Sequence, residues 1–74
     1  MAEKDTGFRE VVKEVRRQLG ISQEDLAREL GVSFATVNRW ENGQVNPSRL
    51  AKNQFDTFCT RMTRNGRLTL SQDE

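Results

Sequence analysis

The sequence contains no histidine and no tyrosine, and it has one cysteine, one proline and one tryptophan. The lack of histidine excludes imidazole-based catalytic triads, histidine metal sites and the commonest acid–base residue. The single Cys59 excludes a disulfide within the chain and is typical of a reducing compartment. No apolar run approaches the roughly 18 residues that a membrane helix needs, and the polar residues 1–5 do not resemble a secretory signal. We therefore expect a cytoplasmic protein that is not an enzyme and holds no metal or cofactor.

Seventy-four residues allow one small domain with a modest core. The net charge is only +1, but it is unevenly distributed. Residues 1–32 are close to neutral, whereas residues 33–67 carry six basic side chains against two acidic ones. A polyanion responds to this local field rather than to the sum. The distribution favours a nucleic-acid partner, and the alternative is that these arginines merely solvate a helix.

The apolar periodicity predicts an all-α fold. Apolar residues recur at steps of three and four between Phe8 and Leu19, which predicts a first helix that Asp5 or Thr6 caps and Gly20 ends. Residues 1–6 are expected to be a flexible N-terminus, and residues 7–65 to form the domain.

Two short helices are predicted next. Ser22 is placed as the N-cap of the second helix, and Asp25 completes a capping box three residues later. Gly31 ends that helix after barely two turns, and Ser33 caps a third helix from about Phe34 to Asn42. Such a short connection predicts a tight helix-to-helix turn.

A fourth helix is predicted to begin at Pro47 behind an Asn46 cap and to fade near residues 65–66. Its apolar stripe comprises Ala51, Phe55, Phe58 and Met62, helped by Leu50 and Cys59. Cys59 is interpreted as a core residue rather than a nucleophile. Residues 66–74 are expected to be a tail that is either flexible or a short strand.

The segment 22–43 has a recognisable pattern. Its elements are Ser22-Gln23, Ala27, Gly31, Val37, Trp40 and Glu41-Asn42-Gly43, followed by Asn46-Pro47-Ser48. A small residue is needed where the third helix crosses the second, a glycine makes the turn, and Val37 and Trp40 anchor the third helix.

This pattern resembles the helix-turn-helix of the lambda-repressor-like, or XRE, family, closely over residues 16–50 and loosely over residues 8–62. The resemblance implies an all-α domain of four to five helices that binds double-stranded DNA in a sequence-specific way as a transcriptional regulator, most often a repressor. It also implies a homodimer, for which the fourth helix and the tail are the candidate surfaces.

The resemblance places the base contacts at the start of the third helix, because that helix enters the major groove. Arg39 is expected to bind guanine, and Asn38 to bind adenine or a phosphate. Phe34 and Ala35 would touch a thymine methyl. The family more often has a polar residue at the Phe34 position, and the alternatives are a place at the core edge for Phe34 and a solvated charge for Arg39. The predicted base contacts are Ser33, Phe34, Ala35, Asn38 and Arg39.

The predicted phosphate contacts lie on both sides of that helix. Ser22 and Gln23 stand where the N–H groups at the start of the second helix favour an anion. Asn42 and Arg49 would bind the backbone on the other side, with weaker candidates at residues 44 and 46. For Gln23 and Asn42, helix capping alone is the alternative.

Arg16 and Glu41 are expected to form a structural ion pair instead. By resemblance, an arginine seven residues before the motif glutamine pairs with the acid that ends the recognition helix. Losing one partner of a buried pair costs about 3–5 kcal/mol, so Arg16→Ala is predicted to be a folding mutant whose DNA defect is secondary.

Two other functions fit the sequence. The domain could serve as an antitoxin with a protein partner, or as a DNA-targeting module of a larger protein. Alternatively it could be a helical protein-interaction module, which suits the near-neutral charge but leaves the cluster of Asn38, Arg39, Asn42 and Arg49 without a reason.

Overall fold

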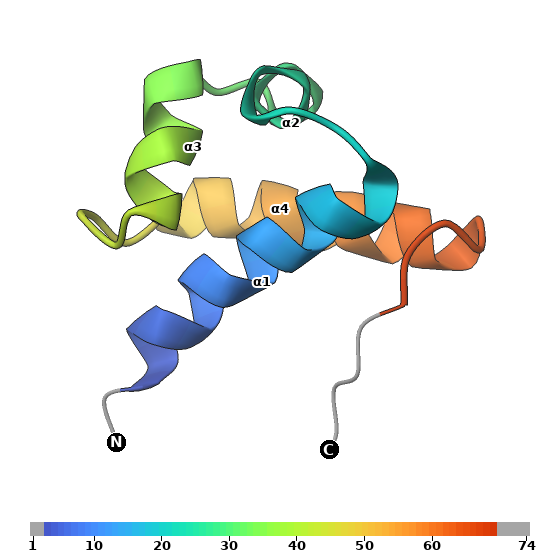
Figure 1. The fold of residues 1–74 in the computed structure, drawn as a ribbon, viewed down its shortest axis with the longest axis horizontal. Coiled ribbons are helices and arrows are strands. Elements are labelled where there is room, and N and C mark those ends of the chain that lie inside the picture. Colours follow the sequence, from blue (N-terminus) through green and yellow to red (C-terminus); the bar gives the residue numbers. More distant parts are fainter. Residues whose placement is uncertain (1–2, 70–74) are drawn as a thin grey trace.

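The computed structural model describes residues 3–69, and their side chains from residue 7 onward. Four helices follow one another in this part of the chain: α1 (Glu3–Leu19), α2 (Gln23–Leu30), α3 (Phe34–Glu41) and α4 (Arg49–Arg64). Figure 1 shows α2 and α3 together on one side of the molecule, above α1 and α4. The all-α fold predicted from the sequence is confirmed for these residues.

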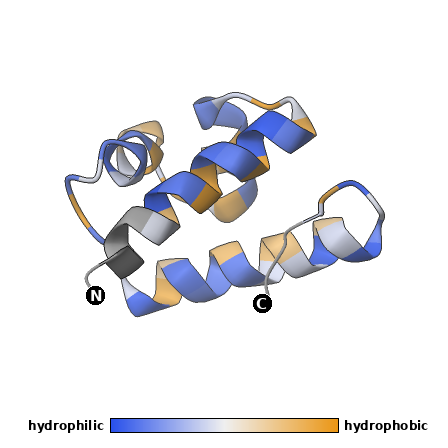
Figure 2. Ribbon diagram, turned by 60° about the horizontal axis from the view of Figure 1, so that its bottom comes forward, coloured by the Kyte–Doolittle hydropathy of each residue, from blue (hydrophilic) through white to orange (hydrophobic). Residues whose placement is uncertain are grey.

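All four helices contribute to one core. Figure 2 shows that apolar segments of α1 and α4 face the inside of the bundle. Phe8 links three helices, because its ring makes edge-to-face contacts with Trp40 at 5.5 Å and with Phe55 at 5.3 Å between centroids. None of the helices in residues 3–69 is both long and apolar enough to cross a membrane. The buried apolar residues are Val12, Val15, Leu26, Ala27, Leu30, Val37, Trp40, Phe55, Phe58, Cys59 and Leu68.

The first helix starts earlier than the sequence predicted. It already includes Glu3, so Asp5 and Thr6 lie inside its first turns and the expected cap at either residue is wrong. Its end was predicted correctly: Gly20 adopts the left-handed conformation, with φ of 67°, directly after Leu19. The flexible N-terminus remains a prediction, and residues 1–2 lie outside the described residues.

The start of α4 also differs from the prediction. Ser48, not Asn46, is the N-cap, and its hydroxyl accepts a hydrogen bond from the Ala51 N–H at 3.1 Å. Pro47 therefore remains in the loop. Leu50 was expected to support the apolar stripe, but its side chain is 69% exposed.

The chain after α4 turns back onto the bundle. The Arg67 N–H donates to the Met62 carbonyl at 2.9 Å, and Leu68 is then buried with only 2% exposure. The side chain of Gln18 in α1 hydrogen-bonds the backbone of Thr69, the residue after Leu68. It accepts from the Thr69 N–H and donates to the Thr69 carbonyl, both at 2.8 Å. Residues 66–69 form no strand, and the sequence did not predict that Leu68 belongs to the core. The rest of the predicted tail, residues 70–74, lies outside the described residues.

Candidate nucleic-acid interface

The short helix α3 has two distinct sides. At about 100° per residue, Val37, Trp40 and Glu41 share one side, and all three are buried. The opposite side, an arc of about 140° by the same geometry, holds five of the predicted contact positions. These are Phe34, Ala35, Asn38, Arg39 and Asn42, of which Asn38 is half-buried and the other four are exposed.

The connection between α2 and α3 fixes how α3 is presented. Gly31 ends α2 in the left-handed conformation with φ of 75°, and its N–H bonds the Ala27 carbonyl. Two residues later Ser33 caps α3. Ala27 is 3% exposed and lies in the apolar core with Val37 and Trp40, as expected for the small residue between crossing helices. The first residues of α3 after this turn, Phe34 and Ala35, are exposed.

Phe34 stands at the first position of α3 with half of its surface exposed. It is absent from the core cluster and from the apolar residues packed against that cluster. The alternative that placed Phe34 at the core edge is therefore wrong. Such an exposed aromatic ring has no role in holding α3 and remains available to a partner.

The hydroxyl of Ser33 is already used by the fold. It accepts a hydrogen bond from the Thr36 N–H at 3.1 Å and lies 2.9 Å from the Thr36 hydroxyl. Ser33 is thus first of all the N-cap of α3. Its predicted base contact would have to share this hydroxyl.

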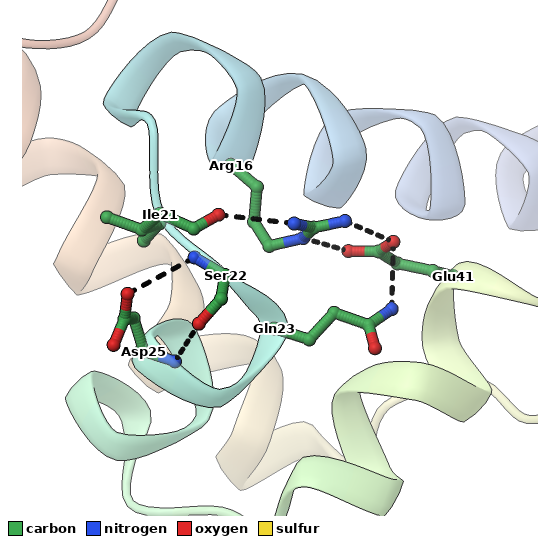
Figure 3. Close-up of polar contacts among 6 residues, drawn as sticks. All are labelled: Arg16, Ile21, Ser22, Gln23, Asp25 and Glu41. Atoms are coloured by element: carbon green, nitrogen blue, oxygen red, sulfur yellow. Dashed lines mark hydrogen bonds and ion pairs between the residues drawn. The ribbon is translucent and has the colours of Figure 1, made fainter.

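A polar network ties α1, α2 and α3 together beside this surface (Figure 3). Arg16 donates from Nε to Glu41 Oε2 at 2.7 Å and from Nη2 to Oε1 at 3.0 Å. Its third nitrogen, Nη1, donates to the Ile21 carbonyl at 3.1 Å, and Gln23 Nε2 donates to Glu41 Oε1 at 3.1 Å. The structure thus contains the ion pair that the resemblance implied, and Gln23 is joined to α3 through the same carboxylate.

Glu41 is the only polar or charged side chain that is buried among the described residues, with 6% exposure. Burial raises the pKa of its carboxyl, but the hydrogen bonds from Arg16 and Gln23 outweigh that effect and leave the pKa below its ordinary value. Glu41 is consequently ionised at neutral pH. The network neutralises the acid that ends α3, so it does not oppose an anion at the surface.

The start of α2 is held by a reciprocal capping box (Figure 3). The Ser22 hydroxyl accepts from the Asp25 N–H at 2.9 Å, and the Ser22 N–H donates to Asp25 Oδ2 at 3.2 Å. The bond from the Ser22 backbone is the main reason why the pKa of Asp25 is lowered. The box confirms the predicted cap, and it places an ionised carboxylate beside the predicted phosphate contact at Ser22.

The remaining predicted phosphate contacts lie around the end of α3. Asn42 is the C-cap of α3, its N–H bonds the Asn38 and Trp40 carbonyls, and its side chain is exposed. Arg49 is the first residue of α4 and is also exposed. Within residues 7–69, neither Arg39 nor Arg49 takes part in a salt bridge. Their charges are therefore not neutralised by this part of the chain.

One close contact at this surface was not predicted. Gly43 has φ of 72°, and a Cβ at this position would overlap the guanidinium of Arg9, which comes from α1. A sequence signal existed, since Arg9 precedes Arg16 by seven residues and so lies on the same side of α1.

Two further features of the described residues concern metal binding and the cysteine. No group of three or more acidic, cysteine or histidine side chains in this part of the chain is arranged to hold a metal ion. Cys59 is buried on α4, and burial raises the pKa of its thiol to about 11. The thiol is protonated at neutral pH and is a core residue, as predicted.

A family model described as helix-turn-helix matches residues 12–50, which include the whole of α2 and α3 and the C-terminal part of α1. That match covers more than half of the sequence. The chain belongs to the XRE-type helix-turn-helix family. The network of Arg16, Gln23 and Glu41 lies inside the matched region.

Curated relatives of this helix-turn-helix chain carry names of the same kind. An uncharacterized HTH-type transcriptional regulator of Methanothermobacter thermautotrophicus is 40% identical over 41 residues, which are 55% of this chain and 59% of the relative. The uncharacterized HTH-type transcriptional regulator YiaG of Escherichia coli K12 is 43% identical over 37 residues, which are 50% of this chain and 38% of the relative. The chain thus aligns with only about two fifths to three fifths of these relatives' lengths. No solved structure matches it significantly.

Proposed function

We propose that the protein binds double-stranded DNA in a sequence-specific way through α3 and acts in the cytoplasm as a transcriptional repressor. The observation that carries this proposal is the two-sidedness of α3. Its buried side already fixes the helix through Val37 and Trp40, whereas its outward side carries residues that the core does not need. Membership of the helix-turn-helix family and the names of the two relatives support the same function.

The dimensions of α3 suit the major groove. Eight residues form a helix about 12 Å long, and the groove is about 12 Å wide and presents a different pattern for each base pair. Arg39 is the residue proposed to donate to guanine O6 and N7, with Asn38 next to it for adenine or a phosphate. The exposed ring of Phe34 and the methyl of Ala35 are proposed to contact thymine methyl groups.

Backbone contacts are proposed on both sides of α3. On one side, Ser22 and Gln23 face the partner from the start of α2, where Gln23 remains joined to Glu41. On the other side, Asn42 and Arg49 bind phosphates from the turn after α3 and from the start of α4. Two such anchors flanking one helix would hold its register in the groove.

We further propose that the protein acts as a homodimer. Helix-turn-helix dimers bind half-sites about 34–36 Å apart, and the described bundle measures 30 × 29 × 21 Å, so two adjacent copies match this spacing. The exposed Leu50 on α4 supplies an apolar contact for such a pair. Sedimentation equilibrium with and without a half-site pair measures the association directly, and a monomer under both conditions would contradict this proposal.

The function is tested by binding to a pool of random duplexes, followed by selection. Fluorescence anisotropy at about 50 and 200 mM salt should show affinity that falls steeply with salt, because phosphate contacts release counterions. Sequencing of the selected duplexes should then show one enriched, palindromic site. Binding without enrichment would contradict sequence-specific recognition, and no binding at the lower salt would contradict the DNA function altogether.

A further inference from the structure

Arg9 occupies a distinctive position on α1. It lies two helical turns before Arg16, and like Arg16 it extends from α1 to the C-terminal end of α3. Arg16 ends on the buried carboxylate of Glu41, whereas Arg9 ends on the backbone of Gly43. Two half-buried arginines from one face of α1 therefore reach neighbouring parts of the same helix end.

Several atoms at the end of the Arg9 side chain lie close to Gly43. A Cβ built on Gly43 would overlap Nη1 and would lie 3.2 Å from Cζ and 3.3 Å from Cδ of Arg9. The guanidinium can lie this close to the turn only because position 43 has no side chain. Asn42, the proposed phosphate contact, directly precedes this glycine and is exposed.

The fold does not use the charge of Arg9 within the described side chains. Glu41 lies two residues before Gly43, and both of its carboxylate oxygens are engaged by Arg16 and Gln23. No salt bridge joins Arg9 to any acid in residues 7–69. Lys13, one turn after Arg9, adds a further positive charge close enough to influence the Glu41 carboxyl. Arg9 and Lys13 of α1 thus bring positive charge to the end of α3.

We propose that Arg9 is a further contact to the DNA backbone and binds a phosphate together with Asn42. The inference rests on the proposed DNA-binding function and deepens it. A guanidinium presents parallel N–H donors that match two phosphate oxygens, and the amide of Asn42 supplies another donor from the neighbouring residue. The phosphate is therefore held between α1 and the turn after α3, which anchors the C-terminal end of the recognition helix as Gln23 anchors the other side.

The test compares Arg9→Ala, Arg9→Lys and wild type on the selected duplex across a series of salt concentrations. Wild-type binding is established first, so failure of the proposed function is seen separately from failure of this inference. Arg64→Ala is the matched control, since Arg64 is an exposed arginine in the last turn of α4 and lies about 22 Å along that helix from Arg49.

Arg9→Ala should lower the affinity about tenfold and reduce the slope of log K against log salt by about 0.9, the value for one lost phosphate contact. The loss should be equal on specific and mutated duplexes, and the melting temperature should be unchanged. Arg9→Lys should restore the slope, and Arg64→Ala should leave it unchanged. An unaltered slope in Arg9→Ala would overturn the proposal, whether the affinity is retained or falls together with the melting temperature.

Discussion

Replacement of Arg16 by alanine removes the link between three helices. The variant loses two hydrogen bonds to Glu41, at 2.7 and 3.0 Å, and one to the Ile21 carbonyl at 3.1 Å. It leaves a carboxylate with 6% exposure supported only by Gln23. Breaking a buried pair in this way costs about 3–5 kcal/mol, and the 26% exposure of Arg16 places the expected loss near 3 kcal/mol.

For a domain of this size, about 3 kcal/mol corresponds to a fall of roughly 12–24 °C in melting temperature. Thermal unfolding followed by circular dichroism measures this change. Arg17→Ala is the matched control, because Arg17 is the next residue on α1 and pairs with Glu14 in an exposed salt bridge. Its melting temperature should change far less.

DNA binding separates a structural role for Arg16 from a direct one. Measured at a temperature where Arg16→Ala is still folded, its affinity should be close to that of wild type after correction for the unfolded fraction. A variant with wild-type thermal stability and no DNA binding would refute the reasoning, because it would make Arg16 a contact to DNA rather than part of the fold.

Four further predictions follow from single features of the structure. Ser22→Ala breaks the capping box, and chemical denaturation should show a loss of about 1 kcal/mol; an unchanged midpoint would contradict the cap. Leu68→Ala should cost about 2–5 kcal/mol in the same assay because Leu68 is 2% exposed, and a neutral result would mean that the segment is frayed. Phe34→Ala should leave the melting temperature nearly unchanged, since the ring is half exposed, and a fall of more than about 5 °C would place Phe34 in the core. Glu41 has a lowered pKa in the fold, so its contribution to stability is fully present above its ordinary pKa of 4.5 and is lost as the pH falls through the folded pKa. Chemical denaturation between pH 7 and 3 should show this loss of stability, and the Glu41→Gln variant should show a smaller loss.

The sequence predicts much of this fold because its signals are local. A serine N-cap acts on the N–H three residues later, so Ser22 and Ser33 are recognisable from their immediate neighbours. The same holds for Gly20 and Gly31, which end helices in the left-handed conformation. The register of each short helix then follows from its caps.

Where two local signals compete, the sequence prediction took the wrong one. Asn46-Pro47 and Ser48 both offer a start for α4, and the structure uses Ser48. This choice accompanies a register in which Leu50 points outward while Phe55, Phe58 and Cys59 are buried.

Contacts between segments far apart in the sequence could not be predicted from patterns of neighbouring residues. Leu68 is buried because the chain turns back after α4, and Gln18 fixes the next residue across 51 positions. Likewise, the spacing of Arg9 and Arg16 places both on one side of α1, but it does not show that Arg9 reaches Gly43. The DNA contacts themselves stay predictions, because only a binding measurement tests them.

Whether α3 recognises base sequence is decided by comparing the sites selected by wild type and by Arg39→Ala. Arg39 is exposed on the outward side of α3 and takes part in no salt bridge within residues 7–69. The variant is expected to keep its melting temperature and to lose discrimination at one base pair of each half-site, by about 1–3 kcal/mol, while Arg64→Ala selects the wild-type site. An unchanged selected site in Arg39→Ala would contradict the claim.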